Sequence, residues 1–365
     1  MIGTVCLKRH YYHCADCAQG FFPWDAKLHL TPQALSPAAE EVACIAGVQN
    51  PFAEASHKTL RRLAGLRLSE STVERTTEGA GQRVVDAFRA GKTFGPQAPW
   101  AWHKDAEGKT VAYVSADATG VGQQGPGGAE ADGRMANVAV IYNPVPESRD
   151  DWADPAAARR PAWQARYLAS LDSFADLGTQ LRRQGAQVGM NGAERWIAIS
   201  DGGNGLEDFL KTNFPRVEAV ILDFYHAAEH LGNLAKAWHP ADQAAAEALH
   251  ERWCHQLKHE GGSALLAMLR TLPLQGRSRA ARQVYEDEVR YFENQVHRMD
   301  YPSYQAKGWQ IGSGPVESAC KRVVGQRLKG AGMRWGEDGA NAVCHLRAVF
   351  LSEAGQWEAL WNYAA

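Results

Sequence analysis

The sequence lacks any run of about 18 consecutive apolar residues, so we expect no membrane-spanning helix. Its first residues, MIGTVCLKRHYYHC, contain no apolar stretch of the kind that forms a signal peptide. The seven cysteines are odd in number and form no regular framework, which favours a reducing, cytoplasmic compartment over a disulfide scaffold. Net charge is also nearly absent, at -2 from 39 basic and 41 acidic residues. Any contact with nucleic acid must therefore depend on local basic patches.

Several catalytic signatures are missing as well. There is no GxxxxGK[ST] motif for a P-loop and no HExxH motif, and the Gly-rich stretch at 120–128 does not open a helix as a dinucleotide site requires. What remains is a chain of 365 residues, 45% hydrophobic and 22% charged, which is an ordinary globular composition. At about 150 residues per domain, this length predicts two or three domains.

The first thirty residues hold a candidate zinc site. The Cys14-x-x-Cys17 spacing is typical of half a zinc knuckle, in which two thiolates on a tight turn occupy two corners of a tetrahedron. A second CxxC is missing, so Cys6 is the candidate third ligand and His13 the fourth. The alternative is a chance pair or an unmetallated remnant. Neighbouring aromatic residues predict a small pair of strands packed over the turn.

The next segment, 31–90, predicts three helices arranged as a helix-turn-helix. Ser36 is an N-cap followed by a proline, 52–64 forms the second helix, Gly65 starts a turn, and Ser69 caps the third helix. The alternative is a plain helical bundle with a solvated charged face. The candidate DNA-binding residues of this segment are Arg61, Arg62 and Arg75.

A mixed α/β sheet is expected after a Gly- and Pro-containing linker. Strands are predicted at 111–116, 135–142, about 166–170, 196–200 and 217–222, with helices at 171–185 and 204–212. Three hairpin-compatible strands followed by alternating helices and strands predict a mixed five-stranded sheet. An all-helical block follows, in which no strand pattern occurs.

Two acidic residues, Asp117 and Asp201, are predicted at the carboxyl ends of strands. In a sheet of order 3-2-1-4-5 the first and fourth strands are neighbours, about 4.8 Å apart, so the two carboxylates lie side by side. Close carboxylates repel unless a cation lies between them, and Mg²⁺ or Mn²⁺ prefers such oxygen ligands. Glu317, in the first turn of a later helix, would complete a site for two ions that act on a phosphodiester. The alternative for Glu317 is a capping-box carboxylate paired with Ser313 or Ser318.

Positive charge is concentrated after Glu317. Since a solvated helical face would normally mix signs, a basic strip beside an acidic metal site fits a phosphodiester backbone. Trp335 could stack on an unpaired base, although packing in the core is favoured. The candidate DNA-binding residues here are Lys321, Arg322, Arg327, Lys329 and Arg334.

Four segments, VSADATGVG, ISDGGNGLEDFL, VILDFYHAAEHL and IGSGPVESACKRVVGQRLKGAGMRW, together resemble bacterial insertion-sequence transposases of the DDE class. The resemblance is to the Mutator-like branch, the ISKra group, and it extends from about Arg9 to Trp361. It implies an α/β fold: an RNase H-like mixed five-stranded sheet with an all-helical insertion, preceded by a small helix-turn-helix-like DNA-binding region. The implied divisions are 1–30 (partial zinc ribbon), 31–90 (helix-turn-helix), 91–109 (linker), 110–226 (first part of the core), 227–305 (insertion), 306–350 (second part of the core) and 351–365 (tail).

The resemblance also implies catalytic roles. Asp117 corresponds to the first catalytic Asp and Glu317 to the catalytic Glu. Both Asp201 and Asp223 are candidates for the second Asp, and geometry favours Asp201 because it follows the strand next to that of Asp117. Asp223-x-x-His226 is similar to the family's (C/D)xxH motif, and the alternative is a buried pair that caps the next helix.

The implied activity is metal-dependent hydrolysis and strand transfer at the ends of an insertion sequence. Asp117 would bridge two Mg²⁺ (or Mn²⁺) ions, with Asp201 and Glu317 each holding one. The implied partners are terminal inverted repeats, target DNA and further copies of the chain, as a homodimer or higher oligomer on paired ends at the bacterial nucleoid. The alternatives are an RNase H-like nuclease that does not join DNA, or a truncated or domesticated DNA-binding protein. The missing second CxxC bears on repeat recognition more than on catalysis.

Overall fold

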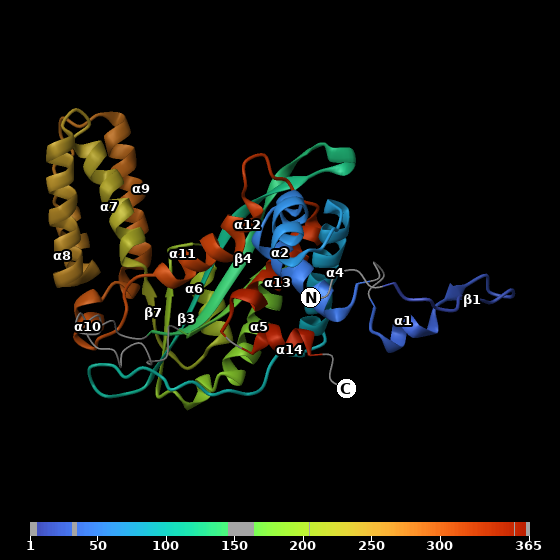
Figure 1. The fold of residues 1–365 in the computed structure, drawn as a ribbon. Coiled ribbons are helices and arrows are strands. Elements are labelled where there is room, and N and C mark those ends of the chain that lie inside the picture. Colours follow the sequence, from blue (N-terminus) through green and yellow to red (C-terminus); the bar gives the residue numbers. More distant parts are fainter. Residues whose placement is uncertain (1–5, 31–34, 145–163, 204, 354, 363–365) are drawn as a thin grey trace.

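A five-stranded mixed sheet forms the centre of the molecule (Figure 1). The computed structural model describes residues 6–30, 35–144, 164–203, 205–353 and 355–362. Strands β3, β6 and β7 are parallel, and β4 and β5 are antiparallel additions on the other side of β3, so the order β5-β4-β3-β6-β7 confirms the order expected from the sequence. The strands are β3 (Val111–Gln124), β4 (Glu130–Asn143), β5 (Gln164–Ser170), β6 (Arg195–Ser200) and β7 (Val217–Leu222).

Helices bury both faces of this sheet. Alternate residues of β3 enter two different clusters, Tyr113 on one face and Val114 on the other, as the two-residue period of a strand requires. One face is covered by the helices that follow β7, and the other by α5 (Phe174–Gln187) and α6 (Leu206–Asn213). Asn204, where the second of these helices was predicted to begin, lies outside the described residues.

The first two strands are longer than predicted. Strands were expected at 111–116 and 135–142, whereas β3 and β4 continue as a ribbon to a turn at Pro126–Gly128. The ribbon leaves the sheet because β6 pairs with β3 only along Val111–Ser115, while the antiparallel partner β4 continues the ladder (Figure 1). Asp117 therefore lies within its strand, just beyond the point where parallel pairing stops.

The N-terminal region contains the predicted strand pair, β1 (Tyr12–His13) with β2 (Gly20–Phe21), followed by α1 (Pro23–Lys27). The Cys14-x-x-Cys17 turn joins the two strands, and the N–H of Cys14 donates to the carbonyl of Gln19 at 2.8 Å. This small unit projects from the body of the molecule (Figure 1).

The three predicted helices after this unit are confirmed. The second begins as α-helix and continues as π-helix to Gly65, whose positive φ of 67° ends it, and Ser69 caps the third helix through the N–H of Thr72. The third helix packs along α13 (Glu337–Leu351), and its Phe88 is buried in the core behind the sheet, so this region shares a core with the rest of the chain. The elements are α2 (Pro37–Gln49), α3 (Phe52–Glu54), η1 (Ala55–Ala64) and α4 (Glu70–Arg89).

The predicted linker and tail are both packed against the body. Residues 91–109 are irregular, as predicted, but Trp100 and Trp102 are buried and the indole N–H of Trp102 donates to the carbonyl of Gly189 at 3.1 Å. The C-terminal segment forms α14 (Gln356–Trp361). Both segments therefore contribute buried tryptophans to the core of the protein.

The predicted helical insertion lies between β7 and Glu317 and stands to one side of the sheet (Figure 1). Its first helix starts at Phe224, and the side chains of Trp238 and Trp253 are buried. None of the helices in the described part of the chain is long and apolar enough to cross a bilayer. The elements of the helical insertion are α7 (Phe224–Trp238), α8 (Gln243–Leu269), α9 (Arg279–Gln295), η6 (Val296–Arg298) and α10 (Tyr301–Ala306).

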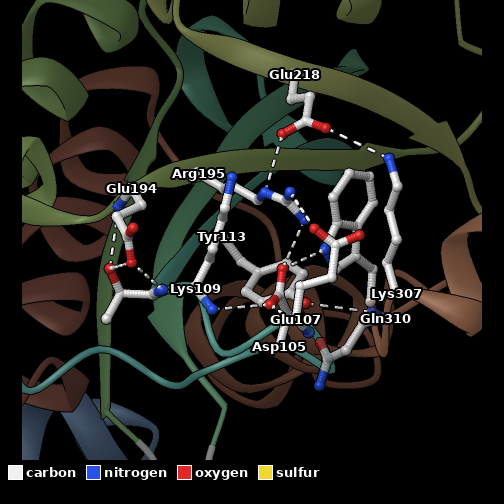
Figure 2. Close-up of polar contacts among 11 residues, drawn as sticks. Asp105, Glu107, Lys109, Tyr113, Glu194, Arg195, Glu218, Lys307 and Gln310 are labelled. Carbon is white, nitrogen blue, oxygen red and sulfur yellow. Dashed lines mark hydrogen bonds and ion pairs between the residues drawn. The ribbon is translucent and has the colours of Figure 1, made fainter.

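A charged network fixes the amino ends of the parallel strands (Figure 2). The Asp105 carboxylate accepts from the Arg195 guanidinium at 2.8 Å and from the indole N–H of Trp309 at 3.2 Å. Arg195 also pairs with Glu218, which lies beside Lys307. Because Trp309 belongs to the segment that leads into the helix of Glu317, the network anchors the start of that segment.

Candidate active site

Three aspartates form one row across the carboxyl edge of the parallel strands. Ser115 pairs with Ile199, and Ser200 pairs with Leu222. Continuing these registers places Asp117, Asp201 and Asp223 at equivalent positions on neighbouring strands. The row therefore contains the two favoured aspartates, Asp117 and Asp201, and also Asp223, the alternative second Asp. Residues at equivalent positions point to the same face of a sheet, so the three carboxylates face the same side.

Glu317 reaches this row from α11 (Gly314–Ala319), in which Pro315 occupies the first turn. A cavity of about 240 Å³ lies between the helix and the row. All five residues that the sequence analysis selected for catalysis line this cavity, and four others line it that the analysis did not select. The lining residues are Asp117, Asp201, Asp223, Tyr225, His226, Glu229, Ser313, Val316 and Glu317.

Asp117 is in an environment that disfavours its charge. Burial raises the pKa of its carboxyl group, and the neighbouring carboxylate of Asp201 raises it further, while His226 opposes both effects. The Asp117 carboxylate accepts from the N–H of Ala118 at 2.6 Å and from the thiol of Cys320 at 3.4 Å. Cys320, which sequence reasoning missed, lies one helical turn after Glu317, and burial, followed by the proximity of Asp117, raises the pKa of its thiol.

Ser313 connects Asp223 to Glu317. Its hydroxyl donates to Asp223 Oδ2 at 2.6 Å and lies 3.0 Å from Glu317 Oε1, but its single proton can serve only one of these carboxylates. Partial burial and the proximity of Asp223 raise the pKa of Glu317. The predicted alternative of a capping box does not form, because the Ser313 side chain makes no hydrogen bond to the backbone of its helix.

Asp223 is more enclosed than Asp201. Its side chain is 1% exposed, and its second oxygen, Oδ1, accepts from the N–H of Tyr225 at 2.9 Å and so caps α7. Asp223 therefore caps the next helix, as the alternative interpretation expected, but it does not form a buried pair with His226, which is only half-buried. Asp201 is partly exposed, and its Oδ1 accepts from the N–H of Gly203 at 2.8 Å.

Arg298 supports the backbone at Asp201 from behind. This buried arginine lies near the end of the helical insertion. It donates to the carbonyls of Ser200 and Asp201 at 3.1 and 3.2 Å, and to the hydroxyl of Ser200 at 2.7 Å. It also donates to the carbonyl of Val220, so it joins the ends of β6 and β7. No local sequence signal identified Arg298, because its partners lie about 80 to 100 residues earlier in the chain.

His226 lies at the side of the cavity with a second histidine behind it. Its ring is 5.0 Å from that of His230, which stacks on Tyr291 with centroids 3.6 Å apart. His230 is fixed by Glu288, at 2.5 Å. His226 itself is half-buried, with Glu229 3.8 Å away, so its ring remains accessible from the cavity.

The donor set suits a hard divalent cation in kind, since carboxylate oxygens are the ligands that Mg²⁺ and Mn²⁺ prefer. Burial, and after it the neighbouring carboxylates, raise the pKa values of Asp117 and Glu317, and a bound cation would oppose both effects. Among the residues that the structure describes, no three His, Cys, Asp or Glu side chains are gathered closely enough to form a metal-binding group. The carboxylates would therefore have to draw together around an ion.

The same finding bears on the predicted zinc site, whose candidate ligands Cys6, His13, Cys14 and Cys17 are all among the described residues. All three thiols are exposed. Hydrogen bonds from the Cys17 backbone and thiol lower the pKa of Cys14, as expected of a turn that favours a thiolate. Zinc binding stays a prediction.

Seven of the eight predicted DNA-binding residues lie on the surface, and one does not. Arg327 is 1% exposed, so the structure corrects its assignment to the basic strip. Its guanidinium lies between the rings of Phe52 and Trp335, at 4.4 and 4.8 Å, and donates to the carbonyl of Gly47. Trp335 is likewise a core residue, as favoured. The exposed residues are Arg61, Arg62, Arg75, Lys321, Arg322, Lys329 and Arg334.

Comparison of the sequence with protein-family models gives no match, and comparison with curated proteins gives none at a significant level. Arguments about function therefore rest on the residues and geometry described above.

Proposed function

We propose that this protein is a DDE transposase, which cuts DNA at the ends of an insertion sequence and joins the freed 3′-OH to target DNA. The observation that carries the proposal is the convergence of Asp117, Asp201 and Glu317 on one cavity from three separate parts of the chain. The strand order supports it, because an RNase H-like core has this order and places its acids at this edge. The helical insertion before Glu317 fits the same family of enzymes.

The environments of the acids support a division of roles. Asp117, Asp201 and Glu317 would hold two Mg²⁺ or Mn²⁺ ions, which when bound polarise the attacking and leaving oxygens of a phosphodiester. Asp223 is nearly inaccessible and both of its oxygens have partners, so Asp201 is the better candidate for the second acid. Through Ser313, Asp223 instead positions Glu317. His226 could donate to a phosphate oxygen at the side of the cavity.

The charge distribution supports DNA as the substrate. Lys321 and Arg322 are exposed directly after the helix of Glu317, and Lys329 donates to the hydroxyl of Thr119 beside the ribbon of β3. These cations would neutralise phosphates of a strand that enters the acidic cavity. The arginines of the η1–α4 region would contact a further part of the duplex, and paired element ends would require a homodimer or higher oligomer in the bacterial cytoplasm.

The test is cleavage and joining of a DNA duplex that carries the flanking element end, with Mn²⁺ or Mg²⁺. We expect metal-dependent joining to a target plasmid that is lost in Glu317→Gln. Glu229→Gln is a matched control, because Glu229 lines the same cavity with its side chain 79% exposed and has no proposed role in catalysis. It should retain the activity of the wild type.

Each other outcome contradicts the proposal in a different way. Cutting without joining would indicate a nuclease on the same fold. DNA binding without any reaction would indicate a non-catalytic DNA-binding protein, and equal activity in Glu317→Gln and the wild type would exclude Glu317 as a catalytic acid.

A further inference from the structure

Tyr225 is an exposed aromatic residue at the acidic cavity. The chain has 12 Trp, 11 Tyr and 11 Phe residues, and outside the N-terminal unit Tyr225, at 66%, is the most exposed aromatic side chain among the described residues. Burying an aromatic side chain is favourable, so a ring left in solvent forgoes that stabilisation of the folded protein. This one lines the cavity together with the three proposed catalytic acids.

The position of the Tyr225 ring is fixed from one side. Its backbone N–H is held by Asp223, and the ring lies so close to Gly312 that a Cβ atom there would come within 2.8 Å of Tyr225 Cε2. The ring of Phe224 meets it edge-on, with centroids 5.7 Å apart. Because Gly312 has no side chain, the ring packs directly on the backbone before α11, while most of its surface faces solvent.

The surroundings supply the rest of a nucleotide site. Exposed Lys321 and Arg322 follow Glu317 by about one helical turn, so they would meet phosphates of the same strand. A base beside that phosphate would be withdrawn from its duplex if the strand entered a cavity of about 240 Å³. Unpaired bases stack on exposed aromatic rings whatever their identity. Trp335, the other candidate for such a role, is 6% exposed and cannot reach one.

We propose that Tyr225 is a stacking site for one unpaired nucleobase, next to the phosphodiester that reacts at the acidic cavity. The inference rests on the proposed function, because it requires a DNA strand in that cavity. The ring, not the phenol hydroxyl, makes the contact. The site would therefore hold the end of a strand whose last base pair is open, without selecting the base.

The test compares binding of two probes by the full-length protein in Ca²⁺, which supports binding without cleavage. One probe is a 24-base-pair duplex with a three-nucleotide thymidine overhang, and the other carries three abasic residues in place of the thymidines. Stacking predicts that the wild type binds the first probe about tenfold more tightly, which corresponds to 1.4 kcal/mol. Tyr225→Ala should reduce this ratio to about one, whereas Tyr225→Phe and Tyr225→Trp should preserve it.

Met135→Ala provides the matched control, because Met135 is an apolar side chain of similar exposure, 54%, on the ribbon of β4. It should leave the ratio unchanged. Since Tyr225 is exposed, its variants should keep the thermal stability of the wild type. A wild-type ratio of one, or a ratio that survives in Tyr225→Ala, would overturn the stacking site while leaving the transposase proposal intact. Failure to bind either probe would overturn both.

Discussion

Replacing Asp117 with Asn should make the protein more stable when divalent ions are absent. Asp117 and Asp201 occupy equivalent positions on adjacent strands, which are about 5 Å apart. Two unit charges at this distance repel by about 3 kcal/mol at an effective dielectric of about 20, and by about 1 kcal/mol in water. Asp117 is half-buried, so we expect a gain of about 1–3 kcal/mol in the free energy of unfolding of Asp117→Asn.

The gain should depend on pH in a defined direction. The pKa of Asp117 is raised in the folded protein, first by burial and then by Asp201. The stabilising effect of its proton is complete below the unfolded pKa of about 3.9 and is lost as the pH rises through the folded pKa. The difference between Asp117→Asn and the wild type should therefore be small at pH 4 and largest at neutral pH.

Urea unfolding in EDTA between pH 4 and 7.5 measures this difference. Asp208→Asn is a suitable control, because Asp208 is an exposed acid on α6, and its replacement should change stability by less than about 0.5 kcal/mol. Added Mg²⁺ should stabilise the wild type and not Asp117→Asn. If Asp117→Asn is less stable than the wild type at pH 7.5 in EDTA, the carboxylates do not repel as argued.

Three further predictions concern the supports of the site. Arg298→Met should lower the free energy of unfolding by about 3 kcal/mol or more, since it leaves buried carbonyls without donors. Arg290→Met, at an exposed arginine, should change it by less than about 0.5 kcal/mol, and equal urea midpoints for the two variants would contradict the prediction. Asp105→Asn should cost about 2 kcal/mol or more, whereas Glu107→Gln, whose carboxylate is 48% exposed, should cost less than about 1 kcal/mol by the same assay. Lys321→Gln should weaken binding of a DNA duplex and reduce the slope of log affinity against log salt concentration by about one. Fluorescence anisotropy at several salt concentrations measures this slope, and an unchanged slope would contradict the prediction.

The positions of the acids could be predicted because they depend on local patterns and one topological rule. A β-rich run followed by Asp predicted where parallel pairing stops, which is the end of β6 for Asp201 and a point inside β3 for Asp117, and neighbouring parallel strands meet at the same edge. The extent of β3 could not be predicted in this way. Glycines at 120 and 122 are typical of loops, and the strand forms because β4 pairs along it and the segment at Trp335 bonds to its outer edge, through Gln124 and Gly122.

The supports of the site depend on contacts between distant segments, so the sequence did not reveal them. Arg298 lies near the end of the helical insertion, where a charged residue predicts a solvated surface, yet it is buried behind Asp201. Arg327 belongs to a run of exposed cations in the sequence, and only the aromatic rings of Phe52 and Trp335 explain why it is inside. A composition-based prediction of a basic strip cannot separate such a residue from its exposed neighbours.

The row of aspartates constrains which changes in chain length evolution can tolerate. Removing one residue from β6 would turn Asp201 to the opposite face of the sheet, because side chains alternate along a strand. Lengthening the connection between α7 and α8 would leave the row untouched, since both ends of the insertion are fixed independently, by Asp223 at its start and Arg298 near its return. Relatives should therefore differ freely in the size of the helical block while keeping strand lengths constant up to the acids.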